Sequence, residues 1–191
     1  MRRAICPGSF DPIHLGHVAV IRRACRLFEE VIVAVSTNPN KKHRFDEQTR
    51  LRLVREVFAD QPAVVVEPLK AGLIADYAAD RDAVALVKGL RNGADYDYEL
   101  PMATMNRTLT GVETVFVPGE PSLLHLSSTL VMEVHGLDGD VSNFVPPQVL
   151  EAIKGRDRAA SSRSAPTAWL VTLRACYHDL SAHVVSQEFR E

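Results

Sequence analysis

The residues best suited to chemistry lie near the N-terminus, at positions 8–17 (GSFDPIHLGH). This segment follows a short apolar run that ends at Cys6 and precedes an amphipathic stretch, which predicts a strand, a glycine turn and a helix. Backbone N–H groups and the dipole at a helix N-terminus attract phosphate, and imidazoles can donate to phosphate oxygens as charge shifts. Ser9 adds a hydroxyl group, and the spacing of His14 and His17 puts both on one helix face. The segment therefore predicts a site for a nucleoside triphosphate.

Two further groups place basic side chains after predicted strands. Lys41 and Lys42 lie in a loop after the second strand, where a solvated lysine pair is the alternative. Lys88 and Arg91 follow the fourth strand, and an arginine can hold phosphate through two hydrogen bonds. Glu99 can accept hydrogen bonds from ribose or adenine groups, or orient one of the basic residues. A surface patch of ion pairs is the alternative for this third group.

A fourth group, Ser127, Ser128 and Thr129, opens a predicted helix after the fifth strand. Hydroxyl residues at this position often serve only as helix caps. At a helix N-terminus they can also cradle phosphate. Combined with the other groups, they favour a phosphate site.

The elements that position these groups alternate along the chain. The predicted strands lie at 2–6, 31–35, 63–67, 83–87 and 114–117, and the second of them is a continuous, mostly β-branched run, as a buried parallel strand should be. The predicted helices lie at 17–28, 46–58, 73–79, 95–109, 127–135 and 146–154. Asp46 is expected to cap the second helix, and Pro101 to start or kink the fourth. This order predicts an α/β, Rossmann-like, doubly wound sheet of five parallel strands with helices on both faces, plus a C-terminal helical extension. Ligands in such sheets bind beyond the carboxyl ends of the strands, where the four groups fall.

Composition narrows the class of protein. The 191 residues suffice for one domain with a sizeable core, and the net charge of −2 lacks the basic character of a nucleic-acid binder. Three widely spaced cysteines argue against a disulfide framework or a metal site and favour a reduced, cytoplasmic setting. No apolar run is long enough for a membrane span. We expect neither nucleic acid nor a membrane as a partner, and no metal ligands among the side chains.

The predicted domains are an α/β domain at 1–157, which carries the four groups, and a linker with a helical tail at 158–191. Residues 159–166 are typical of a linker. Apolar residues then recur at a spacing of three and four, which predicts one stripe on a helix: Leu170, Leu173, Tyr177, Leu180 and Val184. The tail could dock on its own domain, contact another subunit, or lack fixed structure.

The two histidines match the HxGH signature of the nucleotidyltransferase superfamily, and the whole set resembles the phosphopantetheine adenylyltransferase family. The matching pieces, with their order and spacing, are PGSFDPIHLGH at 7–17, NPNKK at 38–42, VKGLRNGADYDYE at 87–99, MNR at 105–107 and LSSTLVMEV at 126–134. The resemblance covers about residues 3–154. It implies transfer of AMP from ATP to 4′-phosphopantetheine, with dephospho-coenzyme A and pyrophosphate as products. It also implies magnesium carried with ATP, a homohexamer and possible feedback by coenzyme A.

The resemblance also implies roles for individual residues. The catalytic residues would be His17 and Lys41. The ATP-binding residues would be Ser9, Phe10, His17, Gly89, Leu90, Arg91, Glu99, Leu123, Leu124, His125, Leu126, Ser127, Ser128 and Thr129. The residues that bind the acceptor substrate would be Ser9, Lys41, Ile74 and Lys88.

Two alternatives remain open at this stage. His14 stands where this family often has threonine, and a histidine there is more typical of nicotinate-mononucleotide adenylyltransferases. A nucleotide-binding regulator without turnover is the second alternative, although it would have little need for His17, Lys41, Lys88 and Arg91 together. Leu123 and Leu124 lie where some members have an aromatic residue, which leaves the packing of adenine open.

Overall fold

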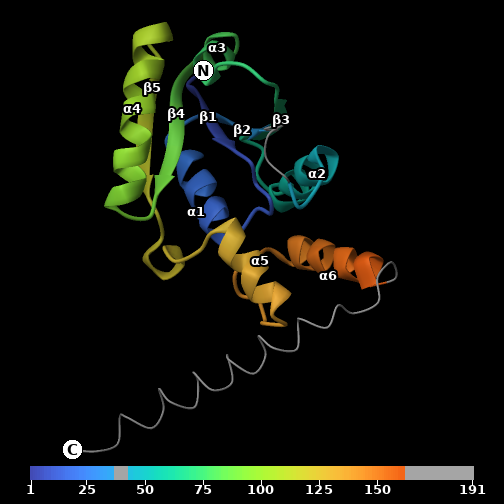
Figure 1. Cartoon of the computed structure of the whole chain (residues 1–191). Coiled ribbons are helices and arrows are strands. Elements are labelled where there is room, and N and C mark those ends of the chain that lie inside the picture. The colour runs from blue at the N-terminus through green and yellow to red at the C-terminus, as the bar shows by residue number, and fades with distance from the viewer. Residues whose placement is uncertain (37–42, 162–191) are drawn as a thin grey trace, which may run out of the picture. The chain divides into compact units, whose positions relative to one another are not determined.

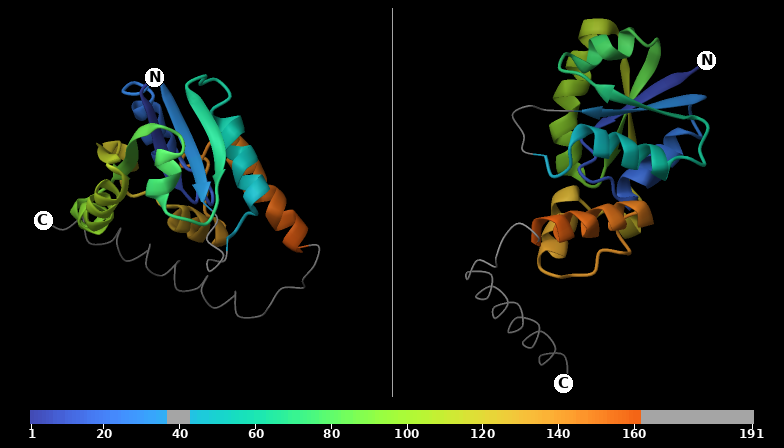
Figure 2. Two further views of the ribbon diagram at one scale, coloured as in Figure 1. Left: turned by 90° about the horizontal axis from the view of Figure 1, so that it is seen from above. Right: turned by 90° about the vertical axis from the view of Figure 1, so that its right-hand side faces the viewer.

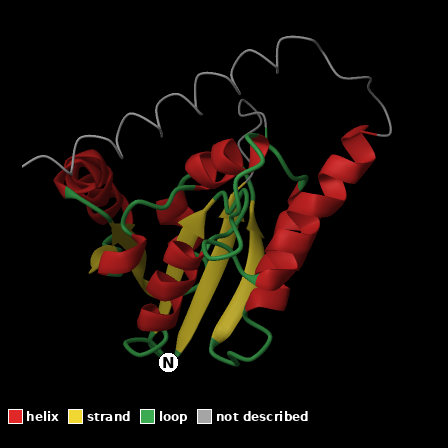
Figure 3. Ribbon diagram, turned by 90° about the horizontal axis from the view of Figure 1, so that it is seen from below, coloured by secondary structure: helices red, strands yellow, loops and turns green. Residues whose placement is uncertain are grey.

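A computed structural model describes residues 1–36 and 43–161 of the chain. One parallel sheet contains five strands in the order β3-β2-β1-β4-β5 (Figures 1 and 3). The strands are β1 (Arg3–Gly8), β2 (Glu30–Ser36), β3 (Val64–Leu69), β4 (Ala83–Leu90) and β5 (Glu113–Pro118). The helices are α1 (Leu15–Ala24), α2 (Glu47–Val57), α3 (Ile74–Ala79), α4 (Gly93–Thr110), α5 (Ser128–Gly136) and α6 (Pro147–Ser161), with a short 3₁₀ helix, η1 (Pro121–Leu123). The predicted α/β class and the five-stranded parallel sheet are confirmed.

Helices cover both faces of the sheet, as the pairing register shows. Ile5 of β1 lies opposite Leu86 of β4, and both pack with Ala75 and Ala78 of α3 in one buried cluster. Gly89 points to the other face, because side chains alternate along a strand, and there it faces Val20 of α1. The helices α1 and α3 therefore lie on opposite faces, and Figure 2 shows the sheet between layers of helices.

The strand β1 extends beyond its predicted end at Cys6. Pro7 and Gly8 continue the pairing with β2, opposite Ala34 and Val35. Proline and glycine commonly interrupt strands, which is why the prediction stopped early. On the β4 side the pairing ends at Ile5, so no neighbouring strand there requires an N–H from Pro7. The turn that follows β1 consequently begins at Ser9.

The helix α4 is longer than predicted and runs through Pro101 without ending. The side chain of Asn92 caps its N-terminus by accepting a hydrogen bond from the Asp95 N–H, at 2.9 Å. Gly111 ends the helix with φ = 78°, in the left-handed region that glycine adopts readily. Pro101 removes the N–H that would reach the Asp97 carbonyl, and both residues are exposed, so water can replace that bond.

Two compact units divide the chain, Met1–Glu151 and Ala152–Glu191. The sheet and all elements from β1 to α5 belong to the first unit. The helix α6 continues through Ser161, past the predicted start of the linker. The stripe predicted at 170–184 lies outside the described residues, so the assignment of a separate tail stays a prediction. In the ranges 1–36 and 43–161, no helix combines the length and apolar character needed to cross a membrane.

Candidate active site

The turn after β1 is held in an unusual backbone conformation. Phe10 has φ = 47°, and its ring folds back over Gly8. A Cβ atom at Gly8 would lie 2.9 Å from Cζ of Phe10, so only glycine leaves room for this ring. The Phe10 ring is 96% buried and meets the ring of His17 edge-on, with 5.1 Å between centroids. The turn and the start of α1 therefore form one packed unit.

The two histidines lie together at the N-terminus of α1. Their rings stack with centroids 3.7 Å apart, as their spacing predicted. The backbone N–H of His14 donates to Nδ1 of His17 at 3.2 Å. A neutral ring whose Nδ1 accepts a hydrogen bond carries its proton on Nε2, so His17 has an Nε2–H available to donate. Among the described residues, Nδ1 of His14 is a buried atom without a hydrogen-bond partner.

Both imidazoles are neutral near pH 7. Loss of hydration, reinforced by the charge of Arg91, lowers the pKa of His14 to about 4. Loss of hydration also lowers the pKa of His17 well below its ordinary value, and His14 and Arg91 act in the same direction. A neutral His17 can still donate a hydrogen bond from Nε2–H to an oxygen that gains negative charge, and it does not first have to be protonated.

The carboxyl end of β4 supplies two basic groups, each paired with an acid of α4. Nζ of Lys88 lies 3.0 Å from Oε2 of Glu99. The guanidinium of Arg91 donates to both carboxylate oxygens of Asp95, each at 2.9 Å, and more weakly to the carbonyl of Leu126 at 3.4 Å. These hydrogen bonds raise the pKa of Arg91 and lower that of Asp95, so both remain charged. The acids thus orient the cations, which was one of the two roles predicted for Glu99.

The segment before α5 closes the same region. Ser127 caps α5 by accepting a hydrogen bond from the Leu130 N–H at 3.1 Å. The hydroxyl of Ser128 donates to the carbonyl of Pro12 at 2.8 Å, which ties this segment to the turn after β1. Two of the three predicted hydroxyl groups therefore already have structural partners within the chain.

A cavity of about 380 Å³ lies between these elements, at the carboxyl ends of β1 and β4. It is lined by Cys6, Pro7, Phe10, His14, Gly16, His17, Val20, Ile21, Val87, Lys88, Gly89, Leu90, Arg91, Asp95, Tyr98, Glu99, Gly119, Glu120, Leu123, Leu126, Ser127 and Ser128. The strand order reverses between β1 and β4, and ligands of open parallel sheets bind at such a switch point. Gly89 allows β4 and α1 to approach closely beside the cavity, because a Cβ atom at this position would lie 2.8 Å from Cγ2 of Val20.

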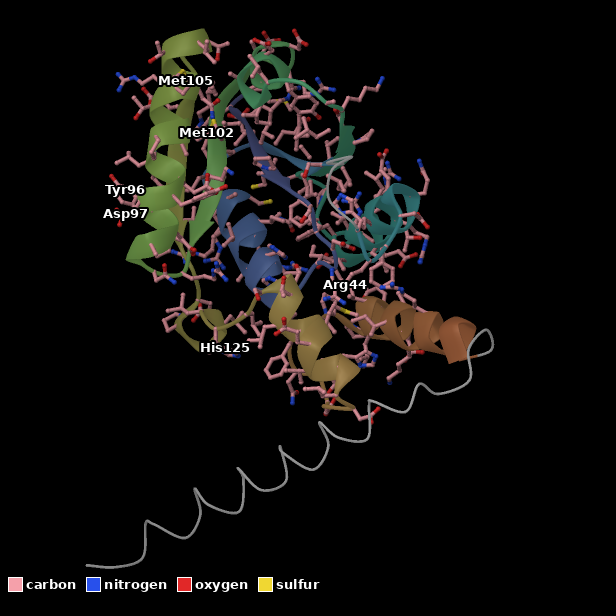
Figure 4. All side chains as sticks on the ribbon, in the orientation of Figure 1. Arg44, Tyr96, Asp97, Met102, Met105 and His125 are labelled. Carbon is pink, nitrogen blue, oxygen red and sulfur yellow. The ribbon has the colours of Figure 1, made fainter. Side chains whose placement is uncertain are left out.

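Most of the predicted ATP-binding residues line this cavity, but several do not. Of the described residues, Ser9, Leu124, His125 and Thr129 are absent from the lining. Leu124 instead packs at Gly119, and His125 lies edge-on to Phe144, with 5.7 Å between centroids. Figure 4 shows the position of His125. The individual binding roles of all these residues stay predictions.

The residues predicted to bind the acceptor are divided in the same way. Lys88 lines the cavity, whereas Ile74 begins α3 and packs against the buried cluster of the sheet. Lys41 lies outside the described residues, so its predicted catalytic and binding roles are not tested here by geometry.

Two polar residues of the cavity were missed as site residues. His14 was predicted to share a helix face with His17 but was assigned no binding or catalytic role, yet it is buried beside His17 and lines the cavity. Asp95 holds Arg91 through both carboxylate oxygens. Arg91 precedes α4, and its backbone N–H also donates to Oδ2 of Asp95 at 2.8 Å, so the pair forms across the start of that helix.

Comparison with known proteins agrees with this geometry. The family model described as Cytidylyltransferase-like matches residues 5–134. A phosphopantetheine adenylyltransferase from Kocuria rhizophila is 80% identical over 154 residues, covering 81% of this chain and 99% of the relative. One from Renibacterium salmoninarum is 61% identical over 150 residues, covering 78% and 94% respectively. The chain belongs to the phosphopantetheine adenylyltransferase family. It is a nucleotidyltransferase by that membership, as the sequence motifs indicated.

A solved structure supports the fold. The structure of a protein from Vibrio parahaemolyticus, assigned as a nicotinate-nucleotide adenylyltransferase, covers 81% of this chain and 93% of its own, with a TM-score of 0.61. Its sequence identity is only 18%, so the likeness concerns the fold alone. The relatives with high identity favour the phosphopantetheine adenylyltransferase family over the alternative that His14 had raised.

Proposed function

We propose that this chain transfers AMP from ATP to 4′-phosphopantetheine, forming dephospho-coenzyme A and pyrophosphate. The observation that carries the proposal is the cavity at the switch point between β1 and β4, where His17, Lys88 and Arg91 converge. The names of relatives up to 80% identical support phosphopantetheine as the acceptor. A regulator without turnover would not require this set of donors around one cavity.

The reaction needs no nucleophilic side chain. The phosphate of the acceptor is already an anion, and one of its oxygens forms a bond to the α-phosphorus of ATP. The bond from that phosphorus to the pyrophosphate oxygen breaks, and pyrophosphate leaves with the electron pair. The protein must align the two reactants and neutralise the developing charge.

His17 would provide that charge stabilisation. Its Nδ1 accepts from the His14 N–H, which fixes the ring and directs Nε2–H as the donor. An oriented donor costs no reorganisation during the reaction, and such donors are among the larger contributions to catalysis. Lys88 would bind the acceptor phosphate and Arg91 the ATP phosphates, while Lys41 keeps its predicted role at the transferred group.

The side chains around the cavity are compatible with magnesium that is bound to the phosphates of ATP. In the part of the chain that the structure describes, no three His, Cys, Asp or Glu side chains cluster to hold a metal. Three acids line the cavity, Asp95, Glu99 and Glu120, and the first two are engaged by Arg91 and Lys88 respectively. Magnesium bound to the phosphate oxygens would reduce their negative charge, and the side chains would hold the nucleotide rather than the ion.

A homohexamer in the cytoplasm, with feedback by coenzyme A, completes the proposal. The helix α4 supports self-association, because Met102 and Met105 are each 55% exposed along it (Figure 4). Leu100 and Leu109 of the same helix are also exposed, and several exposed apolar side chains on one helix are typical of contact surfaces. Light scattering at micromolar concentration tests this assembly, and a monomer would contradict it.

The decisive experiment measures pyrophosphate release from ATP and magnesium with each of two acceptors. Release with 4′-phosphopantetheine alone is the expected result. Release with nicotinate mononucleotide alone would replace the proposed acceptor. Release with neither acceptor would contradict the enzymatic proposal and favour a nucleotide-binding regulator.

A further inference from the structure

Arg50 in α2 is a buried cation outside the lining of the cavity. Arg50 as a whole is only 1% exposed. Its Nη1 group donates to the carbonyls of Ser9 and Ser36, both at 2.7 Å, and its Nε donates to the carbonyl of Phe45 at 3.2 Å. One guanidinium thus joins three separate backbone segments, among them the turn that follows β1.

The same network continues through Asp11, which is 8% exposed. Its Oδ1 accepts the N–H of Phe45 at 2.8 Å, and its Oδ2 accepts the N–H of Arg44 at 2.6 Å. The peptide groups of Phe45 are therefore bound by Asp11 at the N–H and by Arg50 at the carbonyl. Two residues of the turn, Ser9 and Asp11, are tied in this way to the approach to α2.

Stability alone is a weak reason for this arrangement. Removing a guanidinium from water is costly, and apolar side chains of similar volume often replace buried ionic groups without loss of stability. The planar group does offer several donors in a fixed geometry, which specifies direction as well as contact. Arg50 is therefore better suited to fixing a backbone geometry than to supplying net stability.

The geometry that it fixes leads directly to His17. The Ser9 carbonyl bound by Arg50 belongs to the peptide group that precedes Phe10, the residue with φ = 47°. The orientation of this peptide directs the Phe10 ring, which packs edge-on against the ring of His17. A shift of the Ser9 carbonyl would therefore move the Phe10 ring, against which the ring of His17 packs.

We propose that Arg50 is a positioning residue for the transfer reaction, acting on His17 through Ser9 and Phe10. Arg50 itself is not among the residues that line the cavity. This inference rests on the proposed function, because it assigns to Arg50 the task of holding the donor used in that reaction.

The test compares Arg50→Met and Arg50→Lys with Leu53→Ala. Leu53 lies in the same helix and is 1% exposed, so its truncation is a matched control for loss of packing in α2. Each protein is assayed for kcat and KM well below its unfolding temperature, and the imidazole resonances of His17 are recorded by ¹⁵N NMR without substrate. A displacement of about 1 Å can cost up to about 100-fold in rate, so we expect kcat of Arg50→Met to fall at least about tenfold.

The NMR readout decides the proposal. We expect shifted His17 resonances in Arg50→Met, a smaller shift in Arg50→Lys, and wild-type resonances and kcat in Leu53→Ala. Wild-type His17 resonances in Arg50→Met would overturn the proposal whatever the rate. If Arg50→Met does not fold, the same criterion applies to Arg50→Lys. Because the spectra need no turnover, failure of the proposed reaction in the wild-type chain is distinguishable from failure of this inference.

Discussion

Two groups of charged and polar side chains lie at the sheet, and they differ in whether their polar atoms are paired with one another or remain available. One extends from the amino-terminal ends of β1 and β2 to β3 and α3. There Arg3 pairs with Glu30 and donates to the Arg81 carbonyl, while Arg81 pairs with Glu67. The other group surrounds the cavity at the carboxyl ends of β1 and β4. It contains the stacked His14 and His17 in addition to ion pairs.

The first group satisfies its polar atoms internally. The carboxylate of Glu67 accepts from the Tyr77 hydroxyl at 2.8 Å and from Nε of Arg81 at 2.7 Å, and the Arg81 guanidinium lies 3.6 Å from the Tyr77 ring centroid. Burial raises the pKa of Glu67, but these hydrogen bonds outweigh burial and lower it overall. Burial and the bond to Glu67 raise the pKa of Tyr77. This network holds elements together and leaves little for a ligand.

The second group keeps polar atoms available instead. The Nδ1 atom of His14 lacks a partner among the described residues, and the ring of His17 is fixed with one N–H to donate. The contrast teaches that charge near a sheet does not by itself indicate a site. Neutral, dehydrated donors beside a cavity are the more informative feature.

The largest effect should come from His17→Ala. Removing one oriented donor commonly costs about 100- to 1000-fold in kcat, or about 3–4 kcal/mol, and the fold should remain intact. Steady-state kinetics with a melting curve tests this. A loss below about threefold in a folded variant would remove the functional distinction between the two groups.

The second effect is a pH dependence of stability that originates at His14. Its pKa is about 4 in the folded chain and about 6.5 when unfolded, so between these values the unfolded chain binds a proton that the folded chain does not. The free energy of unfolding should therefore fall as the pH falls, by about 2 kcal/mol from this residue between pH 7 and pH 5.

Urea unfolding of wild-type chain and His14→Thr at the two pH values measures that contribution. Threonine does not titrate, so the variant should lose less stability on acidification than the wild-type chain. Equal losses in both proteins would show that His14 is not held neutral by its surroundings.

The smallest effect should come from Tyr77→Phe in the first group. The substitution removes one hydrogen bond to Glu67, which typically lowers the free energy of unfolding by about 1 kcal/mol. Pyrophosphate release per folded molecule should not change. A change in kcat of more than about twofold would mean that the first group also serves the reaction.

Regular features of the fold were accessible from the sequence. A buried parallel strand such as β2 shows in the sequence as a run of mostly β-branched residues. A helix cap can be predicted from the type of residue just before the helix. Asp46 caps α2 as predicted, accepting from the Thr49 N–H at 2.7 Å. The HxGH spacing likewise predicted the shared face of His14 and His17.

Other features depend on contacts that leave no pattern in the chain. Arg50 binds backbone carbonyls, which every residue possesses, so nothing in the sequence marks its partners. Leu124 and His125 are absent from the cavity lining and instead contact Gly119 and Phe144, which no local pattern in the sequence indicates. The extension of β1 through Pro7 and Gly8 depends on where pairing with β4 ends.

The central position of β1 has a consequence for how the chain assembles during synthesis. β1 emerges first from the ribosome, but one of its two neighbours, β4, begins only at Ala83. Distant pairings of this kind are slow, because a long loop must close before they form. The side of the cavity that contains His17 and the side that contains Lys88 therefore come together late in folding. Nucleotide binding by a growing chain would show that β1 and β4 have paired.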